Sequence, residues 1–248
     1  MATPGGSVRS QSVSLHIEAK RGDIAPVVLL PGDPLRARFI ARRFLAEAAC
    51  HNKVRNALGY TGLYRGKRVS VQSTGMGMPS LAIYVHELLH DYGATVLIRV
   101  GTCGALRSEV RLRDLVLAMS ASTDSAMYRP VFGGPGFAPT ASFELLRKAY
   151  AIATARPLRV WCGGVLTSDT FYAPDPAWWK PWAAHGVLAA EMETAALYTL
   201  AARFEARALT ILTVSDHVVT GEHISAHDRQ ASVGEMVTVA LDLAASLA

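Results

Sequence analysis

The sequence predicts an α/β fold, a single domain with a largely parallel or mixed central sheet flanked by helices. Strongly apolar runs alternate with longer segments of helical periodicity, as expected of strands connected by helices. Half of the 248 residues are hydrophobic and 18% are charged, a composition that fills a core and argues against disorder. No linker-like segment divides the chain. We therefore expect one domain over residues 15–248, after a flexible extension rich in Ser, Gly, Thr and Gln at residues 1–14.

The order of elements follows from periodicity and from helix start and stop signals. Pro34 suits the first position of a helix that Asp33 caps, and Gly93 suits the end of another. Ser225 and Asp228 have the spacing of a capping box. In chain order we expect strand 26–30, helix 34–46, strand 68–73, helix 79–92, strands 95–100 and 115–119, helix 142–154, strand 160–166, helix 188–204, strand 208–214 and a helix from 225.

Hydropathy and cysteine usage narrow the class of protein. The chain has no run of about 18 apolar residues and no apolar signal segment near its start. We therefore expect neither a membrane helix nor a secretory signal. The three cysteines stand far apart without a CxxC pair, which predicts a reducing compartment, the cytoplasm, and no structural zinc cluster.

The net charge of +5 comes with 20 arginines against five lysines. The planar Arg fork suits phosphate and carboxylate groups, so this bias hints at an anionic ligand. A genome-wide preference for Arg would explain the same bias. The basic residues are scattered along the chain instead of forming one stripe, which argues against a nucleic-acid partner.

Two segments are candidate anion sites. A strand leads through Gly32 into the start of a helix, where free backbone N–H groups and the helix dipole favour an anion. Arg36 in the first turn opposes that dipole, so either an anion lies between them or Arg36 is simply solvated. Arg99 interrupts an apolar strand near its end, beside Thr102, where open α/β sheets bind ligands. Its guanidinium needs an anionic partner, either a ligand or an internal carboxylate.

Two acidic segments are further candidates. Asp216 follows the strand expected at residues 208–214 and could act as a general acid, and the alternative is an Asp in a turn or a helix cap, which is common. Glu191 and Glu193 are the charged residues of an Ala- and Leu-rich segment. Their carboxylates suit sugar hydroxyls, and the alternative is that one or both face water.

Residues 86–90 match the H-E-x-x-H pattern of zinc proteases. The apolar stripe of this helix lies on the opposite side from His86 and His90, which therefore project to solvent instead of into a cleft. The longer form of the pattern requires a third histidine at the position of Val96. We therefore expect neither a metalloprotease nor a bound metal.

Nine segments in register resemble the nucleoside phosphorylase family, and in particular its hexameric bacterial purine nucleoside phosphorylases. They are residues 16–17, 22–23, 30–36, 58–62, 74–80, 99–104, 168–172, 191–193 and 215–217. The resemblance runs from His16 to the C-terminal helix. It implies the three-layer nucleoside phosphorylase fold. It also implies reversible phosphorolysis of purine (2′-deoxy)ribonucleosides to the free base and (2-deoxy)ribose 1-phosphate.

The resemblance also implies a role for each matching residue. Phosphate would be bound by Gly32, Arg36, Arg99 and Thr102, with Arg55 of a neighbouring subunit. The ribose would be bound by Met76, Met192 and Glu193, with His16 of the neighbour near the 5′-hydroxyl. The base would be bound by Phe171, Ala190, Glu191 and Ser215. Asp216 would donate a proton to purine N7, helped by Arg229.

Inorganic phosphate is then the co-substrate, and the resemblance implies no cofactor and a homo-oligomer, a hexamer built as a trimer of dimers. Thr102 departs from the Ser usual in the purine enzymes and resembles uridine phosphorylases, but residues 173–179 lack the Gln and Arg with which those enzymes hold uracil. A uridine phosphorylase, a nucleosidase that uses water and a non-catalytic nucleoside-binding protein remain alternatives. The preference between 6-oxo and 6-amino purines stays open, as does the role of the loop with Trp178, Trp179 and Trp182.

Overall fold

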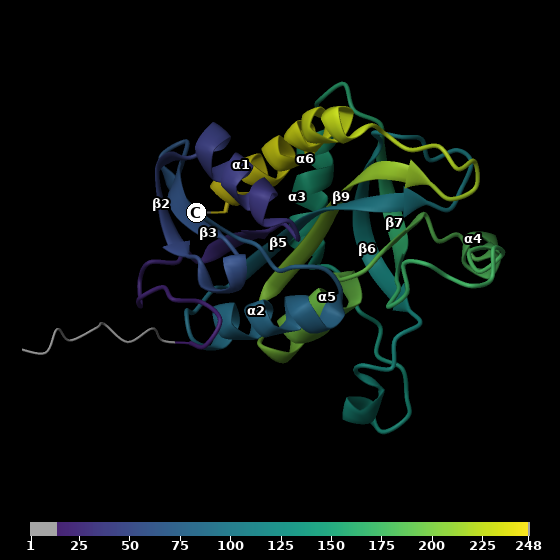
Figure 1. The fold of residues 1–248 in the computed structure, drawn as a ribbon, viewed down its shortest axis with the longest axis horizontal. Coiled ribbons are helices and arrows are strands. Elements are labelled where there is room, and N and C mark those ends of the chain that lie inside the picture. Colours follow the sequence, from purple (N-terminus) through teal and green to yellow (C-terminus); the bar gives the residue numbers. More distant parts are fainter. Residues whose placement is uncertain (1–13, 248) are drawn as a thin grey trace, which may run out of the picture.

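The structure is a computed structural model that describes residues 14–247, apart from the side chains of residues 226–232. The described strands form a nine-stranded mixed sheet in the order β2-β3-β4-β1-β5-β8-β7-β6-β9, in which β9 also pairs with β5. That additional pairing closes strands β5 to β9 into a five-stranded ring, and β1 to β4 extend from it (Figure 1).

The strands are β1 (Val27–Leu30), β2 (Ala46–Asn52), β3 (Gly59–Tyr64), β4 (Lys67–Gln72), β5 (Val96–Ala105), β6 (Leu115–Thr123), β7 (Val160–Thr167), β8 (Ala189–Glu191) and β9 (Arg207–His217). The α-helices are α1 (Pro34–Phe44), α2 (Met78–His90), α3 (Phe143–Thr154), α4 (Lys180–Ala184), α5 (Thr194–Arg203) and α6 (Ala226–Ala245), and short 3-10 turns lie at Val54–Asn56 (η1) and Arg129–Phe132 (η2).

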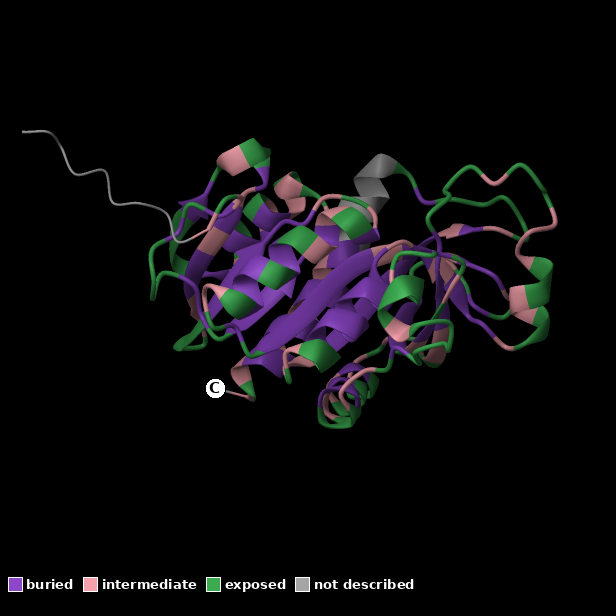
Figure 2. Ribbon diagram, turned by 90° about the horizontal axis from the view of Figure 1, so that it is seen from below, coloured by how far each residue is buried: buried purple, intermediate pink, exposed green. Residues whose placement is uncertain are grey.

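Helices cover both faces of the sheet, which gives the molecule three layers. Helices α2 and α5 pack on one face, and α1, α3 and α6 pack on the other (Figure 1). Strand β1 shows how the sequence produces this, because Val28 and Leu30 face α2 and α5 while Val27 and Leu29 face the opposite layer. The sheet is consequently buried between the helices (Figure 2). The predicted three-layer α/β fold is confirmed.

The parallel part of the sheet sets the position of the site. Strand β1 is parallel to β4 and β5, and β5 is parallel to β9. The carboxyl ends of these four strands therefore lie along one edge of the sheet, where ligands bind in α/β folds.

Three strands run further than their apolar runs predicted, because Gly and polar residues continue the pairing inside the ring. Strand β5 continues to Ala105, β6 to Thr123 and β9 to His217. Arg99 therefore lies in the middle of its strand and not near the end. It is nevertheless at the edge of the sheet's parallel part, since β1 ends at Leu30, directly opposite Arg99.

Residues 188–204, predicted to be mostly helix, form two elements, and the prediction was wrong for the first of them. Ala189–Glu191 is strand β8, and α5 begins only at Thr194. Alanine favours a helix locally. Here β8 fills the gap between β5 and β7, and its hydrogen bonds to both strands override that preference.

Strands β2 and β3 were not predicted, nor was the short helix α4. The first five residues of β2 are exposed, so β2 lacks an apolar run. Strand β3 contains Gly62, whose α-carbon lies so close to the Ala46 carbonyl that a Cβ would approach the oxygen to 2.8 Å. Strand β3 is held by pairing with β4, β2 by pairing with β3, and both by contacts with α1, which local periodicity does not reveal.

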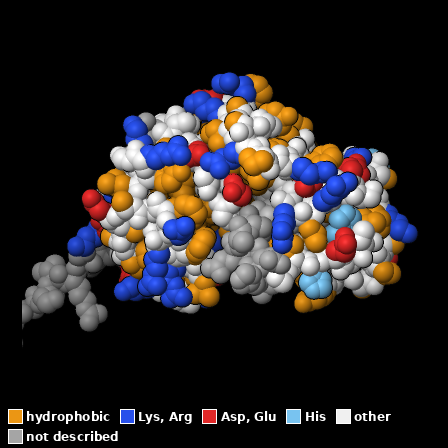
Figure 3. Space-filling model, turned by 90° about the horizontal axis from the view of Figure 1, so that it is seen from above, with side chains coloured by type: hydrophobic (Ala, Val, Ile, Leu, Met, Phe, Trp, Pro, Cys, Tyr) orange, Lys and Arg blue, Asp and Glu red, His pale blue; other side chains and the backbone are white. Residues whose placement is uncertain are grey.

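No helix in residues 14–247 is long and apolar enough to cross a membrane. Helix α6 begins at Ala226, next to the predicted start. The side chain of Asp228, which belongs to the predicted capping box, lies outside the described residues. Apart from Ser14, the predicted extension at residues 1–14 also lies outside the described residues. On the face drawn in Figure 3, Lys and Arg side chains lie in several separate groups among hydrophobic and acidic ones.

Candidate active site

A cavity of about 310 Å³ lies at the carboxyl ends of the parallel strands. Twenty-one residues line it, and among them are Gly32, Arg36, Met76, Arg99, Thr102, Phe171, Ala190, Glu191, Met192, Glu193, Ser215 and Asp216. The structure thus brings together every predicted site residue except His16 and Arg55, which lie elsewhere, and Arg229, whose side chain is outside the described residues.

Gly32 lies at one end of the cavity, where the turns after β1 and β4 touch. Backbone hydrogen bonds join these turns, for example from Gly75 N to the Gly32 oxygen at 3.0 Å. A Cβ on Gly32 would lie 2.8 Å from the Gly75 oxygen, so no larger residue fits without moving the backbone. Asp33 caps α1 as predicted, since its Oδ1 accepts from Leu35 N at 2.7 Å.

Arg36 extends from the first turn of α1 toward β5. Its Nη1 donates to the Val100 carbonyl oxygen at 3.3 Å, which holds the guanidinium beside Arg99 in the cavity wall. Two guanidinium groups and the N-terminus of α1 therefore converge on this end of the cavity. That arrangement favours a small anion.

Arg99 is buried and paired with two internal carboxylates. Its Nε donates to Glu191 Oε2 at 3.2 Å, and its Nη2 forms an ion pair with Glu193 Oε2. Burial alone would lower the pKa of Arg99, but Glu193 and Glu191 together raise it above its ordinary value. Arg99 therefore has the internal carboxylate partners that the sequence allowed as an alternative to a ligand. Because Arg99 also lines the cavity, it presents positive charge to a ligand at the same time.

Glu193 links the Arg99 side chain to the turn that precedes α2. It is the N-cap residue of α5, and its Oε1 accepts from Gly77 N at 2.7 Å. Burial raises the pKa of Glu193 above its ordinary value, although Arg99 opposes that shift. A hydrogen-bonded carboxylate in the wall of a cavity suits the hydroxyl groups of a sugar.

Glu191 lies beside Glu193, but its side chain has no exposed surface. Its two oxygens accept from Arg99 Nε, from Thr167 Oγ1 and from the backbone N–H groups of Glu193 and Thr194. The carboxylate thus serves hydrogen bonds inside the protein. A role of Glu191 toward the base stays a prediction. Because the side chain is occupied by hydrogen bonds within the protein, any contact with the base falls to the backbone of Glu191.

Asp216 lies opposite Gly104 of β5, at the far end of the cavity from Arg99. The sequence predicted that β9 stops before Asp216. Strand β9 instead continues through Asp216 to His217. The register slips between Cys103 and Gly104, so that Ser215 is an extra residue, a β-bulge, in β9. Ser215 Oγ donates to Asp216 Oδ2 at 2.7 Å, which fixes the carboxyl group at the cavity wall.

Large apolar side chains stand open at the cavity mouth. Phe171 is 69% exposed and Met76 is 83% exposed, although both line the cavity. Trp178 lines it as well, from the loop before α4. Exposed aromatic and thioether groups around a cavity suit a flat aromatic ligand.

His16 and Arg55 do not line this cavity. They lie on the surface of the α2 layer, where the His16 ring packs edge-on against Tyr84 at a centroid distance of 6.3 Å. Arg55 is exposed in η1 and has a left-handed backbone, with φ of 54°, a conformation that costs a non-Gly residue free energy. Within one subunit both side chains are separate from the cavity.

The H-E-x-x-H motif does not form a metal site. His86 and His90 are exposed, as predicted, and their rings stack on each other at 5.4 Å. Glu87 points the other way and is buried. The described residues contain no group of three or more His, Cys, Asp or Glu side chains placed to hold a metal ion.

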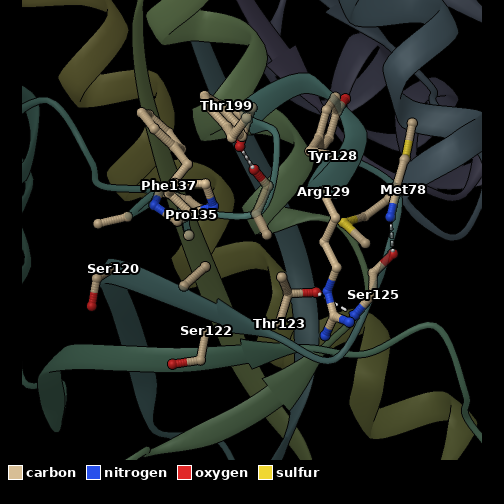
Figure 4. Close-up of a pocket in the computed structure, with 17 residues that line it drawn as sticks. Met78, Ser120, Ser122, Thr123, Ser125, Tyr128, Arg129, Pro135, Phe137 and Thr199 are labelled. Carbon is tan, nitrogen blue, oxygen red and sulfur yellow. Dashed lines mark hydrogen bonds between the residues drawn. The ribbon is translucent and has the colours of Figure 1, made fainter.

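A second cavity of about 440 Å³ lies between β6, the loop after it and α5 (Figure 4). Hydroxyl groups of Ser120, Ser122 and Thr123 stand on one side of it, and Phe137 stands on another. Among its lining residues, all of them described, Arg129 alone carries a charge. This cavity therefore lacks the paired acidic and basic groups of the first.

A family model described as the phosphorylase superfamily matches residues 26–248. The chain belongs to the phosphorylase superfamily. Similar proteins include ones named "Purine nucleoside phosphorylase DeoD-type" from Geobacillus sp. (strain WCH70), with 57% identity over 94% of this chain and 98% of that protein, and from Alkaliphilus metalliredigens (strain QYMF), with 59% identity over 94% of this chain and all of that protein. A third, from Clostridium perfringens (strain SM101 / Type A), is 56% identical over 95% of this chain. The resemblance found in the sequence is confirmed.

This member of the phosphorylase superfamily also has site features that the sequence did not reveal. The bulge at Ser215 depends on how β9 pairs with β5, and no pattern along the chain predicts it. Trp178 was noted only as part of a Trp-rich loop, yet it lines the cavity. Trp178 and its neighbours Trp179 and Trp182 all pack against a small apolar cluster formed by Leu106, Leu166 and Val187.

Proposed function

We propose that this chain is a purine nucleoside phosphorylase, which converts a purine (2′-deoxy)ribonucleoside and inorganic phosphate into free base and (2-deoxy)ribose 1-phosphate. One observation carries the proposal: a single cavity has two arginines at one end and an aspartate at the other. The Arg99 guanidinium lies against Gly101, which is three residues before Gly104, the residue opposite Asp216, or about 10 Å along β5 at the strand rise of about 3.3 Å per residue. In the proposal the pentose and the purine lie between the phosphate and Asp216 in this cavity.

Phosphate is the ligand that suits the Arg end. In the proposal Arg36 and Arg99 bind it with the backbone at Gly32 and the hydroxyl of Thr102. The carboxylate partners of Arg99 hold its guanidinium in place before the ligand arrives, so the site needs little rearrangement when phosphate binds. Arg55 of a neighbouring subunit supplies the third guanidinium.

The pentose lies between phosphate and base. Glu193 accepts hydrogen bonds from its hydroxyl groups, and Met76 and Met192 cover its carbon atoms. His16 of the neighbour reaches the 5′-hydroxyl. This places C1′ next to the phosphate oxygen that attacks it.

The base lies against Phe171 and Ala190 at the Asp216 end. As the phosphate oxygen bonds to C1′, the bond from C1′ to N9 breaks and its electron pair stays on the purine. Asp216, positioned by Ser215, donates a proton to N7, so that the purine leaves neutral and not as an anion. Arg229 assists Asp216 in this proposal, and its side chain lies outside the described residues.

The proposal includes a homo-oligomer, a hexamer built as a trimer of dimers, because His16 and Arg55 lie away from the cavity of their own subunit. It includes no metal or cofactor, since phosphate is the co-substrate and the charges come from side chains. The free thiols of Cys50, Cys103 and Cys162 support a reducing compartment, the cytoplasm.

Product release measured with and without phosphate tests the proposal. Inosine, guanosine, adenosine and uridine are each incubated with the purified protein, and free base and pentose 1-phosphate are quantified. We expect base release from at least one purine nucleoside, only with phosphate present and in equal amount to the sugar phosphate. Base release without phosphate would indicate a nucleosidase, rapid cleavage of uridine alone a uridine phosphorylase, and no cleavage a binding protein.

A further inference from the structure

Glu87 is a buried carboxylate that the proposed reaction does not use directly. It lies in α2, and only 7% of its surface is exposed. Its neighbours in the H-E-x-x-H motif face solvent, so a zinc site does not explain it. A buried carboxylate is stable only with several hydrogen-bond donors, and these identify what it does.

The donors to Glu87 come from one short segment at the start of the described chain. His16 Nδ1 lies 2.6 Å from Oε1, and His16 N lies 3.1 Å from Oε2. Ser14 Oγ donates to Oε2 at 2.6 Å. One carboxylate therefore holds both the ring and the backbone of His16, which fixes the side chain in position and rotation.

The same contact fixes the tautomer of the imidazole. A carboxylate only accepts hydrogen bonds, so the proton of the neutral His16 ring is on Nδ1 and Nε2 is an acceptor. Within the described residues Nε2 has no hydrogen-bond partner, and 30% of the His16 side chain is exposed. The acceptor nitrogen is thus available to a hydroxyl group outside this subunit.

Asn52 joins the His16 segment to the loop of Arg55. The buried Asn52 side chain donates to the His16 oxygen at 3.2 Å and to the Ala57 oxygen at 2.6 Å, and it accepts from Val54 N at 3.2 Å. The His16 ring packs against Tyr84. Burial raises the pKa of Tyr84, and the charge of nearby Arg55 opposes that shift. His16 and Arg55 therefore belong to one preorganised face of the subunit.

We propose that Glu87 is a positioning residue, which holds the His16 ring in the Nδ1–H tautomer so that Nε2 accepts the 5′-hydroxyl of a nucleoside bound in a neighbouring subunit. This inference rests on the proposed function. It assigns Glu87 a role in recognising the 5′ position of the substrate and none in the bond-breaking step.

The test compares two substrates that differ at one group, inosine and 5′-deoxyinosine, on the full-length oligomeric enzyme. Glu87→Gln keeps the shape but lets an amide donate to Nδ1, which favours the other tautomer. We expect kcat/KM for inosine to fall about three- to tenfold, the effect of one hydrogen bond, while kcat/KM for 5′-deoxyinosine changes less than twofold. The ratio of the two values does not depend on how much of the variant is folded.

Three further variants complete the experiment. His16→Ala should lose the same discrimination, and Glu87→Gln combined with His16→Ala should lose no more than His16→Ala alone. His90→Gln, on the exposed side of the same helix, should leave kcat/KM for both substrates unchanged.

Equal losses of kcat/KM on both substrates in Glu87→Gln, which leave the ratio of the two values unchanged, would overturn the inference. A wild-type enzyme that cleaves both substrates equally well would also overturn it while leaving the proposed function standing, whereas no phosphate-dependent cleavage at all would refute the proposed function itself.

Discussion

Asp216 and Glu191 are both carboxylates in the cavity wall, and their surroundings give them different tasks. Asp216 has one hydroxyl donor, Ser215, and stands beside the cavity. Glu191 has no exposed surface and receives hydrogen bonds from Arg99, Thr167 and two backbone amides. The first is available for proton transfer, and the second is committed to the protein. Two substitutions separate these tasks.

Asp216→Asn should slow the chemical step without weakening substrate binding. The amide keeps the size of the carboxyl group and can still accept a hydrogen bond from Ser215, but it has no acidic proton that it can transfer to N7. We expect kcat for inosine to fall by about two to four powers of ten, with KM changed little. The base of 7-methylguanosine already carries the positive charge that protonation would supply, so its phosphorolysis should be nearly unaffected. An equal loss on both nucleosides would contradict the acid role of Asp216.

Glu191→Gln should destabilise the fold more than it alters the choice of base. The substitution removes one of the two charges that balance buried Arg99 and replaces an acceptor by a donor facing the amides of Glu193 and Thr194. We expect the free energy of unfolding, measured with urea, to fall by about 3 kcal/mol, as when one partner of a buried ion pair is removed. A variant of unchanged stability with altered preference among inosine, guanosine and adenosine would show that the side chain contacts the base.

At the scale of elements, sequence reasoning located the turns that form the site better than the strands that support them. The helix start at Pro34 was predicted because its signals, Asp33 and Pro34, are adjacent in the chain. Strand β8 was missed because two alanines acquire a strand conformation only from their neighbours in the ring. The same limit applies to the Arg99 pair, since the sequence required an anionic partner but did not say whether a ligand or Glu191 and Glu193 supplied it.

The extension formed by β2 and β3 depends on a buried histidine. His51 in β2 bonds to Thr61 of β3 at 3.0 Å and to Gln72 of β4 at 3.2 Å. Burial lowers the pKa of His51 to about 4, although the Gln72 hydrogen bond and the charge of Asp23 oppose the shift and Arg68 adds to it. The ring is therefore neutral in the folded protein at neutral pH.

Acidification should consequently weaken the fold through His51. The unfolded chain binds a proton at His51 near pH 6.5 and the folded chain only near pH 4, so this part of the stability is complete above pH 6.5 and is lost as the pH falls toward 4. The loss is up to about 3 kcal/mol for a shift of this size. Urea unfolding at a series of pH values should show a shallower decline for His51→Gln than for wild type between pH 6.5 and 4. Parallel curves would mean that His51 does not titrate in this way.

At the scale of the whole molecule, one subunit contains most of the proposed site, and in the proposal His16 and Arg55 complete the site of a neighbouring subunit. The cavity brings together residues from the turn after β1 and from β5, β8 and β9, while His16 and the loop of Arg55 are held on a separate face by Asn52 and Glu87. The sequence alone predicted that these two residues act in a neighbour, from the resemblance and not from any pattern of their own. The left-handed backbone at Arg55 and the buried Asn52 and Glu87 behind this face support the proposal that it fits a neighbouring cavity.

Mixed oligomers test this arrangement directly. Arg55→Ala leaves each cavity without its neighbour's arginine, and Asp216→Asn leaves each cavity without its acid, so each variant alone should have little activity on inosine. In a mixed pair, the cavity of an Arg55→Ala subunit has its own Asp216 and receives Arg55 from the Asp216→Asn subunit. Co-expression in equal amounts should therefore restore about a quarter of the wild-type sites if subunits pair at random and reciprocally.

The activity of the co-expressed protein is compared with that of the two variants purified separately and then mixed without exchange. Activity no higher than the sum of the separate variants would show that Arg55 acts within its own subunit or not at all.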